Sequence, residues 1–435
     1  MDSRMLLLFQ KLGRFDYEVH KDRISPAYPG TCQWFLTHEQ YHAWRTSDKS
    51  CLLWLSFDPG CGKSVLMRHL ADTFQPSTSS CVCYFFFKAD GDLEQRDLSH
   101  AFSAILHQLF TVFPQWINEL EKEYDRHGSS LVSMGSRLLR IFTDMSKVKV
   151  SRKTEVICLL DAVDECQEPE QTELLHQLIK TIVELSEQGC CNSPRIKFLV
   201  SSRPYNKIKR KLSSLLRQTN GYHIDGNANT DKVSDELSLF TKAQITEICH
   251  EIGLSEHVQN RLIERLATSQ ERTYLWITLV LVEIRQMPGK SERKAFAVID
   301  NLPQTVNEAY EKILAGVRDK SQARKVLSLI LAAERPLTLS EIDAALEVSE
   351  RTSRFSDLDL EGARPREEFV RQVTGLFVTV QNGRVYFLHE TARDFLLRKG
   401  RSSRTLGSKV DEWGSSFSAL EAHKQLADIC VRYLQ

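Results

Sequence analysis

Residues 58–64, with the sequence DPGCGKS, carry the residue types that bind phosphate. Glycines let successive backbone N–H groups turn towards one anion, and a following helix adds its positive N-terminal dipole. Lys63 supplies a point charge for the β and γ phosphates, and the Ser64 hydroxyl can bind Mg²⁺. The predicted nucleotide-binding residues of this P-loop are Pro59, Gly60, Cys61, Gly62, Lys63, Ser64 and Val65.

The loop departs from the full P-loop pattern at one position. That pattern has glycine five residues before Gly62, where this chain has Phe57. The position lies at the end of a strand, ahead of the residues that wrap the phosphates. We therefore expect nucleotide binding to survive, and the geometry at the start of the loop is the open question.

A second group of chemically useful residues follows the apolar run 156–160. A buried strand that ends in a carboxylate delivers it to the carboxyl edge of a sheet, where ligands bind. Asp161 is then suited to Mg²⁺, directly or through water, and Asp164 or Glu165 to orienting or deprotonating an attacking water. The alternative is a strand that meets solvent in acidic residues, and the P-loop upstream favours the metal site.

Two further side chains follow predicted strands. Arg203 comes after the apolar run 196–201 and is able to contact a γ phosphate, or to pair with a nearby carboxylate. Both interpretations of Arg203 stay open. His389 follows the short apolar run 385–388, and a single histidine there is by itself more typical of a capping or surface group.

The elements that would position these residues alternate between strand and helix. Apolar runs at 51–57, 81–87, 156–160 and 196–201 predict strands, and 64–74 and 98–113 have helical spacing. Strands separated by helices predict an α/β P-loop domain with a parallel sheet covered on both faces.

The remainder of the chain predicts helical modules. Residues 206–320 show helical patterns with no clear strand, whereas 377–380 and 385–388 flank Asn382-Gly383, a hairpin signal. Helices followed by a hairpin predict a winged helix. The predicted domains are a helical lead-in (1–50), a nucleotide-binding domain (51–205), a helical lid (206–320), a winged helix (321–400) and a C-terminal helical segment (401–435).

Composition narrows the functional classes. Among 435 residues, 57 Lys and Arg balance 57 Asp and Glu, so no overall charge favours nucleic acid or an anionic membrane. The basic run 207–211 is more typical of a solvated helix face than of a nucleic-acid patch or nuclear signal. The 11 cysteines do not form a disulfide or zinc pattern, and no apolar run is long enough to span a bilayer. We expect a cytoplasmic protein with no nucleic-acid or membrane partner.

Taken together, the motifs resemble the NACHT branch of signal-transducing (STAND-class, NLR-like) P-loop ATPases, especially fungal members with a nephrocystin-3-like N-terminal region. The resemblance covers most of the chain. It rests on eight segments: 30–34, 52–66, 161–165, 202–204, 274–280, 302–305 and the winged-helix pair 336–339 and 389–397.

The resemblance implies a switch. In such proteins ADP holds the nucleotide-binding, helical and winged-helix domains closed, and the winged-helix histidine, here His389, contacts its β phosphate. Exchange for ATP opens the domains and allows homo-oligomerisation, and slow hydrolysis resets the switch. Family members carry an N-terminal effector domain and C-terminal repeats, and we expect this chain to cover the central module, with protein partners that the sequence does not identify.

Two other functional classes stay open. A metabolic P-loop kinase needs an acceptor pocket and a lid within the nucleotide domain, which the downstream helical and winged-helix modules do not favour. A scaffold with a vestigial nucleotide site is supported by Phe57. Adenine is favoured over guanine as the base, because no Asn-Lys-x-Asp stretch follows the fourth predicted strand at a plausible place.

Overall fold

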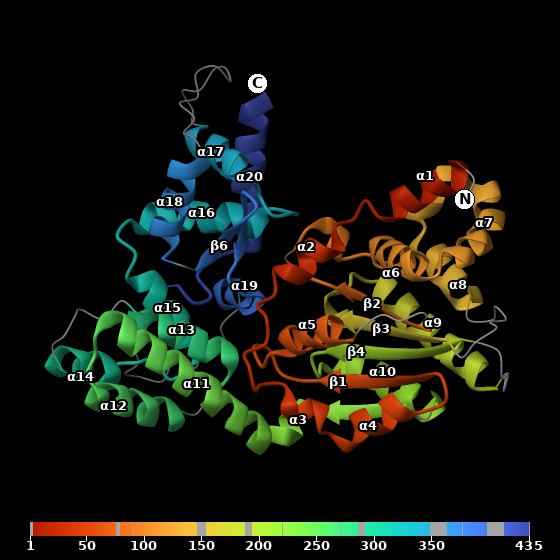
Figure 1. Ribbon diagram of the computed structural model, residues 1–435. Helices are drawn as coiled ribbons and strands as arrows, with labels where there is room; N and C mark the ends of the chain where they lie inside the picture. Colours follow the sequence, from red (N-terminus) through yellow and green to blue (C-terminus); the bar gives the residue numbers. More distant parts are fainter. Residues whose placement is uncertain are drawn as a thin grey trace. The chain divides into compact units, whose positions relative to one another are not determined.

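A computed structural model gives the fold as two compact units (Figure 1). The first unit contains residues 1–89 and 93–242, and the second contains 90–92 and 243–435. The structure describes residues 3–74, 79–89, 91–145, 154–187, 194–219, 221–269, 271–285, 292–348, 363–375, 377–397 and 413–434. The first part of the predicted C-terminal segment, 401–412, lies outside the described residues.

The first unit is built on a five-stranded parallel sheet with the order β2-β3-β4-β1-β5. β1 pairs with β4 in register from Cys51 opposite Lys197 to Ser56 opposite Ser202. Since β1, β3 and β4 are neighbours that run the same way, the loops after them meet at one edge of the sheet. The strands are β1 (Cys51–Ser56), β2 (Ser80–Phe86), β3 (Glu155–Asp161), β4 (Arg195–Ser202) and β5 (Tyr222–Asp225).

Helices cover both faces of this sheet, as Figure 1 shows. Alternate residues of each strand face opposite sides, so Leu52 and Trp54 join one core while Leu53 and Leu55 join the other. The helices of this unit are α1 (Ser3–Leu12), α2 (Tyr17–Asp22), α3 (Gln33–Leu36), α4 (Glu39–Thr46), α5 (Lys63–Thr73), α6 (Leu98–Val112), α7 (Glu121–His127), α8 (Gly135–Met145), α9 (Glu170–Glu187) and α10 (Asn206–Thr219). The predicted fold class is confirmed.

The second unit is helical, with one antiparallel hairpin. The helix α11 (Thr230–Ile252) begins in the first unit and ends in the second. The other elements are α12 (Glu256–Ala267), α13 (Tyr274–Arg285), α14 (Glu292–Asp300), α15 (Val306–Ala315), α16 (Lys320–Ala332), α17 (Leu339–Glu347), α18 (Ala363–Thr374), β6 (Val378–Gln381), β7 (Arg384–Phe387), α19 (Glu390–Leu397) and α20 (Ala419–Leu434).

The hairpin and its helices form the predicted winged helix. Asn382 and Gly383 join β6 to β7, and both have positive φ, 50° and 71°, as a primed two-residue turn requires. The Thr338 hydroxyl and the Glu341 carboxylate form a reciprocal capping box at the start of α17. Side chains of α15, α16, α17, α18 and α19 share one apolar core with the hairpin.

The expectation of no strand in 206–320 is wrong, because β5 lies there. Only Ile224 of this four-residue strand is fully buried, so β5 shows neither a long apolar run nor a clear alternation. It becomes a strand by pairing along β1, from Tyr222 opposite Leu53 to Asp225 opposite Ser56. Among the described residues, no helix is long and apolar enough to cross a membrane.

Candidate nucleotide-binding site

The P-loop joins the end of β1 to the start of α5. Gly60 and Gly62 have φ of 76° and 87°, a region that other residues rarely adopt, so the loop needs glycine at both places. Gly62 is also the N-cap of α5. The amides of Gly60, Cys61 and Gly62 donate no hydrogen bond to another described residue. These N–H groups and the helix N-terminus are therefore available to an anion.

Lys63 lies over this loop. Its Nζ donates to the carbonyl oxygens of Phe57 at 2.6 Å and Asp58 at 2.9 Å. Burial lowers the pKa of Lys63, while the nearby carboxylates of Asp164 and Asp161 act to raise it. The ammonium is thus held beside the loop by neutral oxygens and faces two acidic side chains. Phosphate oxygens offer such a cation stronger, charge-assisted hydrogen bonds than carbonyls do.

Phe57 is a buried part of the structure at the start of the loop. Its side chain is 4% exposed and meets Trp34 edge-on, with ring centroids 5.7 Å apart. A Cβ at Gly226 would lie 2.4 Å from the Phe57 ring, so the two residues pack as a ring against a glycine. Phe57 does not have a positive φ, so the backbone at this position does not need glycine.

Phe57→Gly is therefore expected to destabilise the domain without improving nucleotide binding. Removing this buried ring leaves a cavity, which costs about 3–5 kcal/mol of unfolding free energy by the usual cost of Phe→Ala substitutions. Denaturant unfolding measures the loss, with Phe57→Leu as the control that retains most of the apolar volume. A Phe57→Gly protein that binds ATP more tightly than the wild type would show that the phenylalanine impairs the loop.

Asp161, at the end of β3, is held between two hydroxyl groups. Ser201 Oγ on β4 donates to Asp161 Oδ1 at 2.5 Å, and the Ser64 hydroxyl also hydrogen-bonds to this carboxylate. The side chain is 2% exposed, and burial raises its pKa while both hydroxyls and Lys63 act to lower it. The two predicted metal ligands, Ser64 and Asp161, are thus in direct contact.

These two side chains fit a magnesium ion. Mg²⁺ takes oxygen ligands and is bound in phosphate sites by one or two protein oxygens together with phosphates and water. Ser64 and Asp161 supply a hydroxyl and a carboxylate at one point of the phosphate-binding edge. No cluster of three or more His, Cys, Asp and Glu side chains that could hold a metal occurs in the part of the chain that the structure describes.

Asp164, Glu165 and Arg203 form a charged group beside Lys63. Arg203 Nε lies 3.4 Å from Asp164 Oδ2, and its terminal nitrogen lies 3.6 Å from Glu165 Oε1. The Arg203 backbone N–H also donates to Asp164 at 3.2 Å. Arg203 and Asp164 are almost fully buried, so the pair is shielded from solvent. The interpretation of Arg203 as an ion-pair partner is therefore realised in this structure.

Three residues of this site are given no role by the sequence motifs. Ser201 accepts from the Ala162 N–H at 2.8 Å while it donates to Asp161, which fixes its orientation. Ala162 has φ of 53°, an uncommon conformation for alanine, and turns the chain directly after Asp161. The Tyr205 hydroxyl accepts from Arg203 at 2.7 Å. Their roles depend on the packing of β3 against β4, which spacing along the chain does not give.

His389 lies in the second unit, directly before α19, and is half-buried. Its Nδ1 accepts from the backbone N–H of Thr391 at 3.2 Å and lies 2.8 Å from the Thr391 hydroxyl. The side chain therefore caps the first turn of α19, as the bare sequence suggests. Its predicted contact with nucleotide is a proposal.

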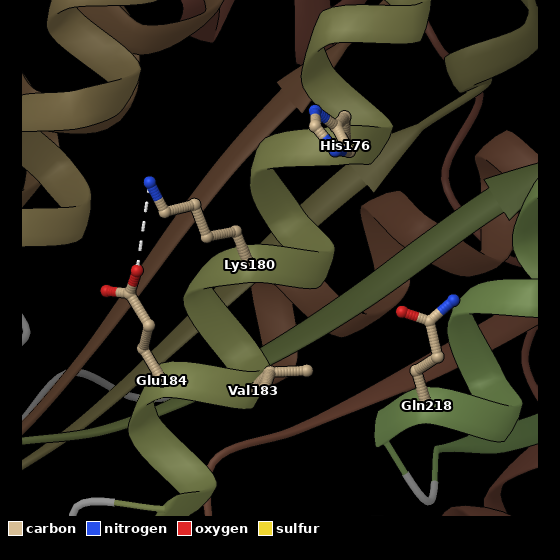
Figure 2. A pocket seen from close by; sticks show the side chains of 5 residues that line it. All are labelled: His176, Lys180, Val183, Glu184 and Gln218. Atoms are coloured by element: carbon tan, nitrogen blue, oxygen red, sulfur yellow. Dashed lines mark ion pairs between the residues drawn. The ribbon is translucent and has the colours of Figure 1, made fainter.

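A separate pocket lies between α9 and α10 (Figure 2). It has a volume of about 350 Å³ and includes an ion pair of 3.9 Å between Lys180 and Glu184. None of the predicted nucleotide-binding residues contributes to it. The residues that line the pocket are His176, Lys180, Val183, Glu184 and Gln218.

The basic run 207–211 lies on α10, where Lys209 and Arg210 are exposed and Lys211 pairs with Glu168 on the segment before α9.

Comparison with known families matches two segments of the chain. Residues 30–203 match the family described as Nephrocystin 3, N-terminal. Residues 310–405 match the family described as GPI inositol-deacylase, winged helix domain. The first segment contains the P-loop, the acidic run after β3 and Arg203, and the second contains the hairpin and His389.

A curated relative matches along most of the chain. The vegetative incompatibility protein HET-E-1 of Podospora anserina is 25% identical over 402 residues, which is 90% of this chain. The match covers 28% of the length of HET-E-1, so the chain corresponds to a minor part of that protein.

Solved structures with distant similarity include two replication proteins. The Aeropyrum pernix ORC2 protein is 12% identical with a TM-score of 0.38, and 90% of each chain is covered. Domain III of the Thermotoga maritima replication initiation protein DnaA is 14% identical with a TM-score of 0.32, over 65% of this chain and 96% of that one. The fold assignment rests on the parallel sheet and its loops, and not on these similarities.

The two family matches and the HET-E-1 match agree with the arrangement of the site. A glycine loop, a lysine and a serine follow β1, a buried aspartate ends β3, and an arginine follows β4, all at one edge of a parallel sheet. The first unit therefore has the fold and loop arrangement of a P-loop NTPase, and the chain is similar in sequence to the nephrocystin 3 N-terminal family and to a winged helix domain family.

Proposed function

We propose that the chain is an ATP- and ADP-binding switch in which the bound nucleotide selects between two conformations. A ligand shifts such an equilibrium only by its difference in affinity for the two states, so some residues must distinguish ATP from ADP. Lys63 and Ser64 would bind the phosphates that both nucleotides share. Asp161 and Arg203 would favour ATP, and His389 would favour ADP.

The observation that carries this proposal is the convergence of Lys63 and the acidic groups at one edge of the sheet. The pKa of Lys63 is acted on by the Asp161 and Asp164 carboxylates, and Ser64 hydrogen-bonds to Asp161. A bound Mg²⁺ would neutralise phosphate charge at Ser64 and Asp161. The protein supplies the loop amides, the Lys63 ammonium and the proposed metal ligands Ser64 and Asp161, which together would bind a nucleoside triphosphate.

The ion pairs of Arg203 support a role for this residue in distinguishing ATP from ADP. In this structure its guanidinium pairs with Asp164 and Glu165, the same carboxylates that would orient an attacking water. A γ phosphate would compete for the guanidinium, because bidentate arginine–phosphate pairs are strong. Transfer of Arg203 to phosphate would release a carboxylate to act as a base. Hydrolysis would then be a slow reset of the switch, with Asp164 and Glu165 in the catalytic role.

The biological setting is proposed from the relative. HET-E-1 is a vegetative incompatibility protein, and this chain matches about a quarter of its length. We propose that the chain serves a similar fungal non-self recognition pathway, inside the cytoplasm, where nucleotide exchange controls homo-oligomerisation and binding to other proteins. The five predicted domains stand as the proposed organisation of this switch.

His389→Ala is expected to raise the dissociation rate of ADP about tenfold or more and that of a non-hydrolysable ATP analogue about twofold or less. Loss of one hydrogen bond to a charged group costs roughly 1.5–3 kcal/mol, and the contact is proposed for the ADP state alone. Stopped-flow release of a fluorescent nucleotide measures both rates. His423→Ala, an exposed histidine on α20, is the matched control. An equal increase in the dissociation rates of both nucleotides would show that His389 does not distinguish ADP from ATP.

A further inference from the structure

Three side chains of the second unit, including His389, form a hydrogen-bonded chain. The Tyr310 hydroxyl lies 2.9 Å from Thr391 Oγ1, which lies 2.8 Å from His389 Nδ1. Tyr310 belongs to α15, and Thr391 to the first turn of α19. All three residues lie in the second unit.

The direction of each hydrogen bond follows from one backbone amide. The Thr391 N–H can only donate, and it does so to His389 Nδ1 at 3.2 Å, so this ring nitrogen carries no proton. The Thr391 hydroxyl must then donate to Nδ1 as well, which leaves its oxygen to accept from Tyr310. A neutral imidazole without a proton on Nδ1 carries it on Nε2.

The core of the winged helix fixes the far end of this chain. Tyr310 is fully buried, and its ring meets Phe377 edge-on at 5.1 Å and Phe395 at 5.5 Å. Burial raises the pKa of Tyr310 to about 12, so the hydroxyl keeps its proton at neutral pH and acts as a donor. Because the ring cannot reorient in this packing, the direction of donation is set by the fold.

We propose that Thr391 and Tyr310 are positioning residues that keep His389 in the Nε2–H tautomer, so that His389 donates this hydrogen to an anionic oxygen of a nucleoside diphosphate. The inference rests on the proposed function, in which His389 contacts ADP. The opposite tautomer would turn a lone pair of Nε2 towards the phosphate and repel it. The tautomer therefore determines whether this histidine attracts or repels the diphosphate.

Thr391→Val and Thr391→Ser test this proposal in the full chain. Valine keeps the shape of the side chain and removes the hydroxyl, whereas serine retains the hydroxyl. We expect valine to raise the ADP dissociation rate about three- to tenfold, by the usual worth of one hydrogen bond, and serine to restore the wild-type rate. Tyr310→Phe is expected to act in the same direction with a smaller effect, because it removes only the outer hydrogen bond.

NMR of the ring nitrogens gives a readout that a general loss of stability would not move. With histidine-selective ¹⁵N labelling, and His389→Gln to assign the signal, the nitrogen shifts report which ring nitrogen carries the proton. We expect Nε2–H in the wild type and in Thr391→Ser, and a larger Nδ1–H fraction in Thr391→Val, because only the backbone N–H then remains to donate to Nδ1. A wild-type signal of the Nδ1–H type would overturn the proposal.

The kinetic results separate this inference from the proposed function. If His389→Ala accelerates ADP release and Thr391→Val does not, His389 binds ADP and the positioning role is wrong. If His389→Ala leaves ADP release unchanged, the contact with ADP is wrong, and with it the purpose of the tautomer. Faster release in both variants, with rescue by serine, supports both.

Discussion

Lys63→Ala is expected to weaken ATP and ADP binding by about 100-fold or more. The change removes the Lys63 ammonium from the loop, and each phosphate hydrogen bond to a charged donor is worth roughly 1.5–3 kcal/mol. Lys63 serves both nucleotides in the proposed switch, so both affinities should fall together. Isothermal titration calorimetry with ADP, and with ATP and Mg²⁺, measures the two losses.

The control for this substitution is Lys49→Ala. Lys49 is an exposed lysine just before β1, at the other end of the strand that leads into the loop. Its replacement changes the net charge by the same amount and should leave both affinities unchanged. Circular dichroism establishes that both variants are folded. If the Lys63→Ala protein is folded and binds nucleotide as tightly as the wild type, the P-loop assignment is wrong.

Asp161→Asn is expected to abolish the gain in ATP affinity that Mg²⁺ provides. ADP binding in the absence of Mg²⁺ should stay largely intact. Asparagine has the shape of aspartate, and its amide oxygen can still accept from Ser201, so the buried site stays filled. The negative charge that would hold the metal beside Ser64 is lost. We expect ATP hydrolysis to fall about 100-fold, by the usual loss when a charged group of an electrostatic site is removed.

Nucleotide affinity measured with and without Mg²⁺ tests this expectation. Wild-type ATP binding should tighten when Mg²⁺ is added, and Asp161→Asn should show no such tightening. Asp48→Asn is the control, since its side chain is 87% exposed and lies before β1. A variant that still gains affinity from Mg²⁺ would show that Asp161 does not hold the metal.

The parts of the fold that carry local signals are predictable from the sequence. β1 and β3 are unbroken apolar runs that end in Ser56 and Asp161, and the Asn382-Gly383 turn adopts the positive φ values that its residue types favour. β5 is not predictable in this way, because it is a four-residue strand that gains its structure by pairing with β1.

The residues of the candidate site also fall into those that the sequence predicts and those that it does not. The residue types and spacing of the P-loop and of the 161–165 run indicate a phosphate and metal site, since consecutive residues carry the chemistry. Partners supplied by another strand are hidden from such patterns, and Ser201, which orients Asp161 from β4, is one example. The sequence also leaves the role of Arg203 open. The structure shows its guanidinium between Asp164 and Glu165.

Phe57 illustrates how structure changes the interpretation of a motif departure. In the sequence it is a missing glycine and the best support for a vestigial site. In the structure the backbone there has no positive φ, and the ring packs on Gly226 and Trp34. The phenylalanine is thus part of the core next to the loop, and the glycines that the loop conformation requires, Gly60 and Gly62, are present.

The most direct test of the central claim is to identify the nucleotide released when the purified full chain is denatured. Chromatography of the supernatant, compared with the Lys63→Ala protein prepared in parallel, gives the result. The proposed switch predicts close to one equivalent of ADP from the wild type and none from Lys63→Ala. A folded wild-type protein that releases no nucleotide and binds neither added ADP nor ATP would contradict the account and favour a scaffold with a vestigial site.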